Sequence, residues 1–253
     1  MSDWLDVRPG PADRLRLFCF HHAGGGVSAF RGWRAALAPD IAVYPVQLPG
    51  REARVREPRI TDLATAVAAI GRELDPWLDR PYAFYGHSMG ALIAHTLTDR
   101  LLAADRPLPA RLLVGAFPGP LLRAPLAEVS GMSDDQLVEL LLRIGGMSET
   151  VRRYPDWRAA AISLLRADLS LCHGPRPPAG PALPVPIDVV AGAADPLVSP
   201  GDVDAWATHS TVEVRTHVVP GGHFFLHDKE NGLLDLIRSA LGPVAVRSTG
   251  STM

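Results

Sequence analysis

A serine between two glycines is the residue of this sequence best placed to do chemistry. Residues 86–90 read Gly-His-Ser-Met-Gly, after an apolar run at 82–85 and before apolar residues at helical spacing. This order predicts a strand, a sharp turn and a helix, with the hydroxyl of Ser88 lifted clear of the sheet. The N–H of Met89 would lie at the helix N-terminus, where it can stabilise an oxyanion. The motif therefore predicts a nucleophile and one half of an oxyanion hole.

A serine nucleophile requires a base, and the base requires a carboxylate that fixes its tautomer. In hydrolases with such a turn, the acid and then the histidine follow the serine along the chain. Asp195 comes after an apolar strand at 187–190 and a small-residue loop, and His223 follows Pro-Gly-Gly after the last strand. We expect Ser88, Asp195 and His223 to form a catalytic triad.

The loop after the first strand is expected to supply the second oxyanion donor. It reads His-His-Ala-Gly-Gly-Gly at 21–26, and its glycines allow backbone N–H groups to approach a ligand closely. We assign this role to the N–H of Ala23, together with that of Met89. A phosphate-binding loop is the alternative, but the P-loop pattern and its lysine are absent. His21 and His22 are expected to pack the loop rather than to react.

We expect neither a metal nor a cofactor. His223 and His227 are four residues apart, which is the spacing of some metal-binding pairs. No nearby glutamate completes a zinc-protease motif, so the sequence does not favour a metal site.

The elements that must position these residues alternate between strands and helices, which predicts a mostly parallel sheet covered on both faces. We therefore predict an α/β fold as a single domain over residues 1–253. Strands are expected at 15–20, 41–46, 82–85, 112–115, 187–190 and 212–219, the last near a sheet edge. Helices are expected at 29–37, at 61–78, after the serine and around 233–241.

The alternation breaks between residues 121 and 183, where helical patterns follow one another without a strand. One apolar stripe, opened by the capping sequence Ser-Asp-Asp-Gln at 133–136, covers residues 137–144. A second stripe is predicted on Trp157, Ala160, Ala161, Leu164 and Leu165. We interpret residues 121–183 as a helical lid inserted over the carboxyl edge of the sheet, where open α/β sheets bind their substrates.

Composition excludes several classes of protein. The 253 residues carry a net charge of −2, which provides no basic field for nucleic acid or an anionic membrane. The two cysteines are too few for a disulfide framework and indicate reduced thiols. The sequence shows neither a signal peptide nor an apolar run of about 18 residues that could span a membrane. We expect a cytoplasmic protein, with a monomer as the default.

Taken together, these motifs resemble the type II thioesterases that accompany polyketide and nonribosomal peptide synthases, in the α/β-hydrolase superfamily. The resemblance covers about residues 14–241. It rests on the stretches at 20–25, 47–51, 86–90 and 220–225, on Arg54 and Glu57, on Leu-Leu-Arg-Ala-Asp at 164–168, and on Asp195 in the position of the family's acid. It implies an α/β-hydrolase fold and a Ser-His-Asp acyl-enzyme mechanism.

The resemblance also implies the substrate, an acyl group on the phosphopantetheine arm of an acyl or peptidyl carrier protein. The biological role would be the removal of stalled or wrong acyl groups. Arg51 and Arg54 could contact the carrier, although a structural salt bridge near Glu57 is favoured. Three alternatives remain: a carboxylesterase or lipase, a product-releasing terminal thioesterase domain, and an inactive binding module. Met1 at the start favours a free-standing enzyme over the terminal domain.

Overall fold

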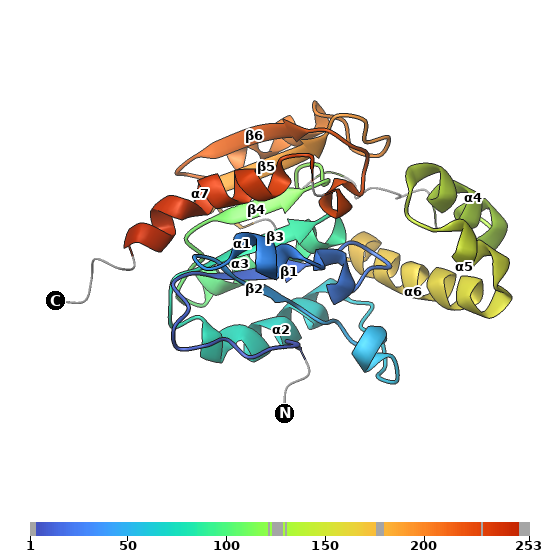
Figure 1. Ribbon diagram of the computed structural model, residues 1–253, viewed down its shortest axis with the longest axis horizontal. Helices are drawn as coiled ribbons and strands as arrows, with labels where there is room; N and C mark the ends of the chain where they lie inside the picture. The colour runs from blue at the N-terminus through green and yellow to red at the C-terminus, as the bar shows by residue number, and fades with distance from the viewer. Residues whose placement is uncertain are drawn as a thin grey trace.

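The structure, a computed structural model, describes residues 4–120, 122, 129, 131–175, 180–228 and 230–247. Six parallel strands form a single sheet with the order β2-β1-β3-β4-β5-β6 (Figure 1). The strands are β1 (Arg16–Phe20), β2 (Ala42–Pro45), β3 (Tyr82–His87), β4 (Leu112–Gly115), β5 (Ile187–Gly192) and β6 (Val214–Val219). The predicted α/β architecture with a parallel sheet is confirmed.

Burial along the strands follows their place in the sheet. Every residue of β1, β3, β4 and β5 is buried, as expected for parallel strands covered on both faces. β6 lies at one edge of the sheet and has exposed residues at Arg215, Thr216 and Val218, which confirms its predicted edge position.

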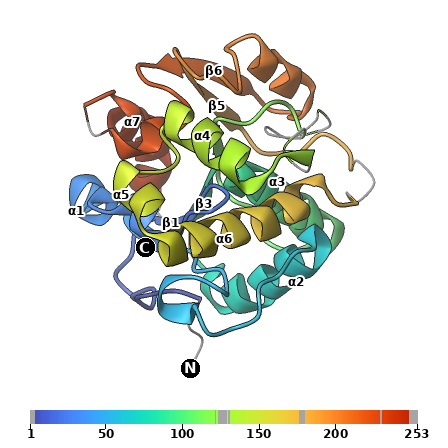
Figure 2. The ribbon, with the colours of Figure 1, turned by 90° about the vertical axis from the view of Figure 1, so that its right-hand side faces the viewer.

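Two groups of helices cover the two faces of the sheet. The helices of the main body are α1 (Trp33–Leu37), α2 (Leu63–Leu74), α3 (Met89–Ala103) and α7 (Leu233–Arg247). The apolar residues of α2 and α3 share one core with the strands, and those of α1 and α7 form the core on the opposite face. Figures 1 and 2 show this layered arrangement.

Two predicted helices are shorter than expected, each for a local reason. The helix predicted at 29–37 is divided, because Gly32 has a φ of 88° and separates a 3-10 turn from α1. In the helix predicted at 61–78, Asp62 caps the start of α2 by accepting a hydrogen bond from the N–H of Thr65. After Leu74 the chain continues as a 3-10 turn that contains Pro76, a residue that cannot donate to an α-helical ladder.

Three further helices follow one another between β4 and β5. They are α4 (Asp134–Ile144), α5 (Glu149–Arg153) and α6 (Pro155–His173). We call these three helices the helical insertion. Figure 2 views the molecule from their side and shows them in front of the sheet. Within the predicted 121–183 segment, residues 121, 123–128, 130 and 176–179 lie outside the described residues.

The start of the insertion matches its prediction, whereas one apolar stripe does not. Ser133 and Gln136 form the predicted capping box of α4. On α6, however, Trp157 is 58% exposed and Ala160 is exposed as well, while Ile162 and Leu165 are buried. The first turns of α6 extend beyond the edge of the sheet, so they have little core to cover (Figure 1).

The strand register brings the chain segments that follow the strands to one edge. Phe20 pairs with Gly86, His87 with Gly115, and the last residue of β5 with the last residue of β6. The predicted functional residues all follow these strand ends, so the fold collects them at the carboxyl edge beneath the helical insertion.

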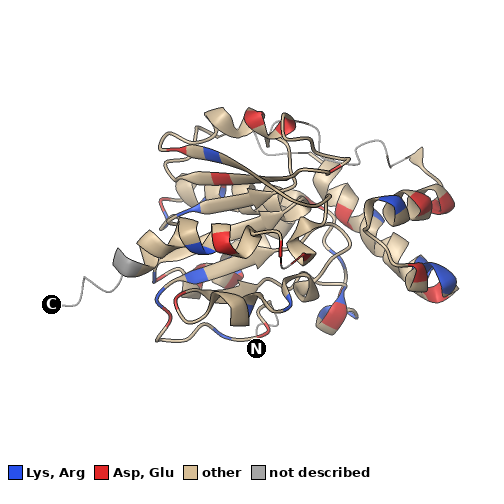
Figure 3. Ribbon diagram, turned by 45° about the horizontal axis from the view of Figure 1, so that its top comes forward, with Lys and Arg blue, Asp and Glu red and all other residues tan. Residues whose placement is uncertain are grey.

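In the view of Figure 3, acidic and basic residues are interspersed along the ribbon. Among the described residues, no helix has the length and apolar character needed to cross a membrane.

Candidate active site

Ser88 occupies the sharp turn between β3 and α3. Its φ of 52° and ψ of −115° lie outside the regions that side-chain-bearing residues normally adopt. Such strain persists only where surrounding structure enforces it, and it lifts the hydroxyl out of the strand. The predicted strand, turn and helix are all present, so the local structure expected around this serine is confirmed.

The two flanking glycines are required by close backbone contacts. A Cβ on Gly86 would lie 2.1 Å from the carbonyl oxygen of Gly90, and a Cβ on Gly90 would lie 2.0 Å from that of Phe20. Any side chain at either position would therefore push α3 away from β1 and β3. This contact carries the Ser88 hydroxyl to its place at the sheet edge.

His223 connects Ser88 to Asp195. His223 Nε2 lies 3.1 Å from Ser88 Oγ, and Nδ1 lies 2.9 Å from Asp195 Oδ2. Because an ionised carboxylate can only accept, Nδ1 carries the hydrogen and Nε2 is left to accept from the serine hydroxyl. The structure thus brings together the three residues that the sequence selected, in the arrangement of a nucleophile, a base and an orienting acid.

The carboxylate of Asp195 is fixed on both oxygens. Its second oxygen, Oδ1, accepts hydrogen bonds from the backbone N–H groups of Leu197, at 2.8 Å, and Val198, at 3.2 Å. The side chains of Asp195 and His223 are 0% and 4% exposed. Gly192 lets the Asp195 loop approach the His223 loop, since a Cβ there would lie 2.7 Å from the oxygen of Gly222. The two loops therefore hold the carboxylate within hydrogen-bonding distance of the imidazole.

A second histidine supports the loop of His223 from below. His87 Nε2 donates to the carbonyl oxygen of His223 at 2.7 Å, and the hydroxyl of Tyr85 donates to His87 Nδ1 at 3.0 Å. Burial, followed by the neighbouring His223, holds the pKa of His87 well below its usual value, so this ring is neutral. His87 was not among the residues predicted from the sequence. Its neighbours along the chain give no signal, because the carbonyl oxygen that it supports lies 136 residues away.

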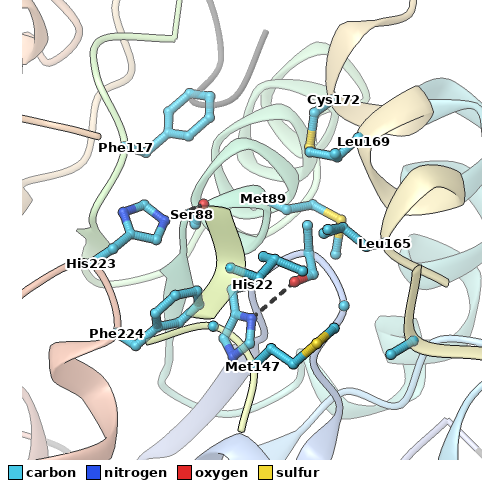
Figure 4. Close-up of a pocket in the computed structure, with 15 residues that line it drawn as sticks. His22, Ser88, Met89, Phe117, Met147, Leu165, Leu169, Cys172, His223 and Phe224 are labelled. Carbon is cyan, nitrogen blue, oxygen red and sulfur yellow. Dashed lines mark hydrogen bonds between the residues drawn. The ribbon is translucent and has the colours of Figure 1, made fainter. Parts of the chain in front are cut away.

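A small apolar cavity of about 70 Å³ lies against Ser88 (Figure 4). Ala23 and Met89, the two predicted oxyanion donors, line this cavity beside Ser88 and His223. Met89 is the first residue of α3, so its N–H has no acceptor within the helix. The remaining apolar walls come from the sheet edge, the insertion and the His223 loop: Phe117, Leu141, Met147, Ala161, Leu165, Leu169, Cys172 and Phe224.

His22 also faces this cavity, as a neutral side chain. Its Nδ1 donates to the carbonyl oxygen of Ala23 at 3.0 Å, and its ring contacts Phe224 edge-on at 4.8 Å between centroids. Burial lowers the pKa of His22 to about 4, with the neighbouring His227 and His223 acting in the same direction. A neutral ring bonded to its own loop fits the packing role predicted for this residue.

The other histidines lie away from Ser88 or only at its margin. His217 on β6 is hydrogen-bonded to Asp188 on β5. His209 packs against Trp206, and His173 is the last residue of α6. Within the described ranges, no group of three or more His, Cys, Asp or Glu side chains is placed to hold a metal ion.

The two arginines of the Arg51–Arg54 segment have different partners. Arg54 binds Glu57 through Nη2, at 2.5 Å, as the sequence favoured, and its guanidinium lies 4.3 Å from the Trp4 ring centroid. Arg51 instead binds Asp168 of α6 at 2.7 Å, and this pair was not predicted. A signal for it existed. Asp168 falls on the buried helical face that includes Leu165 and Leu169, where a charge needs a partner.

Comparison with known proteins decides the family. The model of the Thioesterase domain family matches residues 15–241. The chain belongs to the thioesterase family. Its relatives include the gramicidin S biosynthesis protein GrsT of Aneurinibacillus migulanus, which is 31% identical over 238 residues, or 94% of this chain and 93% of GrsT.

Two solved thioesterase structures resemble the chain over nearly its whole length. The RedJ thioesterase of the prodiginine biosynthetic pathway in Streptomyces coelicolor is 36% identical, with a TM-score of 0.82 over 92% of this chain and 91% of RedJ. The type II thioesterase BorB from the borrelidin biosynthetic cluster is 32% identical, with a TM-score of 0.82 over 95% of this chain and 99% of BorB. The resemblance drawn from the sequence motifs is therefore confirmed at the level of the family and the fold.

Proposed function

We propose that this thioesterase releases acyl groups from the phosphopantetheine thiol of a carrier protein, with Ser88, His223 and Asp195 as its catalytic residues. The observation that carries the proposal is the hydrogen-bonded series from Asp195 through His223 to Ser88, which ends at an apolar cavity. Such a series activates a serine, and the cavity offers apolar contacts to an acyl chain.

The residues support two half-reactions. In the first, Ser88 Oγ attacks the thioester carbonyl while its proton moves to His223 Nε2. The N–H groups of Ala23 and Met89 stabilise the tetrahedral oxyanion, and the C–S bond breaks as His223 returns the proton to the leaving sulfur. In the second, a water gives its proton to His223 and attacks the acyl-serine. The acid is released when the bond between the acyl carbon and Ser88 Oγ breaks and His223 returns the proton to Ser88 Oγ.

The family supports a role in biosynthesis, where such an enzyme would clear stalled or wrong acyl groups from a synthase. The acyl group arrives on the carrier's arm, so the proposal includes no cofactor. In it, the helical insertion acts as a lid over the cavity. Neither Cys19 nor Cys172 forms a disulfide within the described part of the chain, which suits a reducing compartment, and we place the enzyme in the cytoplasm.

The experiment that tests the proposal is time-resolved intact-mass analysis of an acyl-loaded carrier protein. We expect the acyl mass to be lost rapidly with the unmodified enzyme and to persist with Ser88→Ala, because that variant keeps the fold but lacks the nucleophile. The matched control is Ser170→Ala on the exposed face of α6, which is expected to retain full activity. A Ser88→Ala variant as active as the unmodified enzyme would refute the catalytic assignment.

Free acyl oxyesters distinguish the competing activity. Carrier-bound thioester cleaved faster than oxyester supports a carrier-directed thioesterase. A stable acyl-carrier with brisk, Ser88-dependent cleavage of oxyesters would instead identify a carboxylesterase.

A further inference from the structure

A buried ion pair joins the helical insertion to the body of the protein. Arg51 Nη1 lies 2.7 Å from Asp168 Oδ2, and Arg51 Nη2 lies 2.7 Å from Asp168 Oδ1. This two-point contact fixes both the distance and the orientation of the two side chains. The two side chains are 3% and 0% exposed. With so little of its guanidinium at the surface, Arg51 is inaccessible to a carrier protein and acts within the molecule.

The same carboxylate holds the loop that carries the proposed oxyanion donor. Gly24 N–H donates to Asp168 Oδ2 at 2.7 Å, and Arg51 Nη1 also donates to the carbonyl oxygen of Gly25 at 3.1 Å. Gly24 has a φ of 76°, and a Cβ on it would lie 3.6 Å from Leu165 Cδ1 of α6. The backbone on the carboxyl side of Ala23 is thus fixed by Asp168 and Leu165 of α6 and by Arg51 from the loop after β2.

The other hydrogen bonds of this loop are local: the His22 ring donates to the Ala23 carbonyl oxygen, and the Gly25 N–H donates to the His22 carbonyl oxygen. Residues 23–26 are an alanine and three glycines, so the chain lacks large side chains that could anchor it by packing. An oxyanion hole works because its donors are already in position before charge develops. A small rotation of the Ala23–Gly24 backbone would turn the Ala23 N–H away from the carbonyl oxygen of a substrate.

We propose that Asp168 and Arg51 are positioning residues, which hold the Ala23 N–H in the geometry required by the oxyanion. The inference rests on the proposed function, because it takes Ala23 as a donor in hydrolysis at Ser88. It makes the oxyanion hole depend on the helical insertion: α6 is in place, and the hole is formed, only when Asp168 binds both Arg51 and the Gly24 N–H.

The test uses Asp168→Asn and a small soluble acyl thioester of N-acetylcysteamine. We expect kcat to fall by about ten- to hundredfold, less than the roughly 10²–10³ lost with a whole oxyanion donor. We expect KM to stay within about twofold, because the walls of the cavity are unchanged. Affinity for an alkyl boronic acid, whose tetrahedral adduct with Ser88 places an oxygen in the oxyanion hole, should fall by a factor similar to that of kcat.

The matched control breaks a different buried pair. Asp188→Asn removes the carboxylate that binds Arg111 at the start of β5, the end of the strand remote from Ser88. We expect it to lower Tm while leaving kcat and boronate affinity unchanged. If Asp168→Asn likewise lowers Tm but leaves kcat and boronate affinity unchanged, its effect is on stability alone, and the proposal is overturned.

A double variant keeps the proposal testable if Asp168→Asn fails to fold. Arg51→Met with Asp168→Leu replaces the ion pair by apolar side chains, which buried pairs often tolerate, but leaves the Gly24 N–H without its acceptor. A folded double variant with the kcat and boronate affinity of the unmodified enzyme would refute the positioning role, as would failure of both variants to fold. Failure of the proposed function is separate: the unmodified enzyme would then lack thioesterase activity, while boronate affinity would still report the effect of Asp168→Asn on the loop.

Discussion

Some residues around Ser88 can be predicted from their neighbours in the sequence, and others cannot. Asp195 and His223 each follow a strand on a short loop of small residues, so their type, order and position along the chain are enough to select them. His87 gives no such signal. Its two partners are the Tyr85 hydroxyl and a carbonyl oxygen that only the folded chain brings within reach.

We predict that His87 positions the His223 loop relative to Ser88. His87→Leu leaves the His223 carbonyl oxygen and the Tyr85 hydroxyl without a buried partner, and we expect kcat to fall by about tenfold or more, since small displacements of a base are costly. His87→Gln can donate to the same carbonyl and accept from the same hydroxyl, so it should recover part of kcat. Steady-state kinetics with a soluble thioester would measure both variants.

The matched substitution for this test lies on α3, away from Ser88. His95→Leu removes another covered histidine, which packs against Trp206 and His209, and should leave kcat unchanged. Equal losses in His87→Leu and His95→Leu would show that burial, rather than support of the His223 loop, is what matters.

Secondary structure was predictable where it depends on local pattern. Buried strands, the α4 capping box and the turn at Ser88 follow from apolar runs, a Ser-x-x-Gln spacing and a pair of glycines. The division of the helix predicted at 29–37 depends on a positive φ at Gly32, which a glycine permits but does not require. Exposure of Trp157 could not be predicted, because helical spacing shows which residues share a face but not what that face meets.

The contact between α3 and β1 yields a prediction at the level of elements. Gly90→Ala would bring a Cβ against the backbone of Phe20, which cannot move as a flexible side chain can. We expect the free energy of unfolding to fall by at least about 3 kcal/mol, as in severe overpacking. Urea denaturation followed by circular dichroism would measure it.

A glycine in another helix provides the control. A Cβ at Gly242 in α7 meets nothing within 4 Å. Gly242→Ala should therefore raise the free energy of unfolding by about 0.5–1 kcal/mol, the helical preference of alanine over glycine. Similar stabilities for the two alanine variants would contradict the close-contact account of the turn.

At the scale of the whole molecule, the sequence predicts the set of elements but not their full assembly. Alternating strands and helices indicate a parallel sheet, and parallel strands must place their carboxyl ends at one edge. Nothing local, however, specifies that Arg51 and Asp168, 117 residues apart, meet beneath the insertion. Pairings of this kind arise from tertiary packing, so a charge on a buried helical face indicates that a partner exists without indicating which one.

Burial of several histidines leads to a prediction about the stability of the whole chain. Burial lowers the pKa of His22 to about 4 and the pKa values of His21 and His87 well below their usual value. In the unfolded chain these groups have pKa values of about 6.5. Between about pH 6.5 and 5 the unfolded state therefore binds protons that the folded state does not, and acidification lowers the free energy of unfolding.

The magnitude follows from proton linkage. Each such histidine contributes a slope of at most about 1.4 kcal/mol per pH unit, positive with rising pH and fully developed only below its unfolded pKa. The contribution of His22 levels off below about pH 4, where the folded state also binds its proton. Urea unfolding at several pH values between about 7.5 and 5 would give the slope. This window lies above the ordinary carboxyl pKa values, so carboxylates contribute little.

His21→Leu isolates one contribution to that slope. His21 is 1% exposed, its Nε2 has no hydrogen-bond partner among the described residues, and the nearby Arg51 adds to the lowering of its pKa. Replacing it removes one proton-binding group from the unfolded chain. The slope of the free energy of unfolding against pH should therefore fall by up to about 1.4 kcal/mol per pH unit, the contribution of one proton. Altered packing changes the absolute stability at every pH alike, whereas the slope depends only on the difference in bound protons. An unchanged slope would mean that His21 is protonated in the folded protein, which its place beside a buried arginine makes unfavourable.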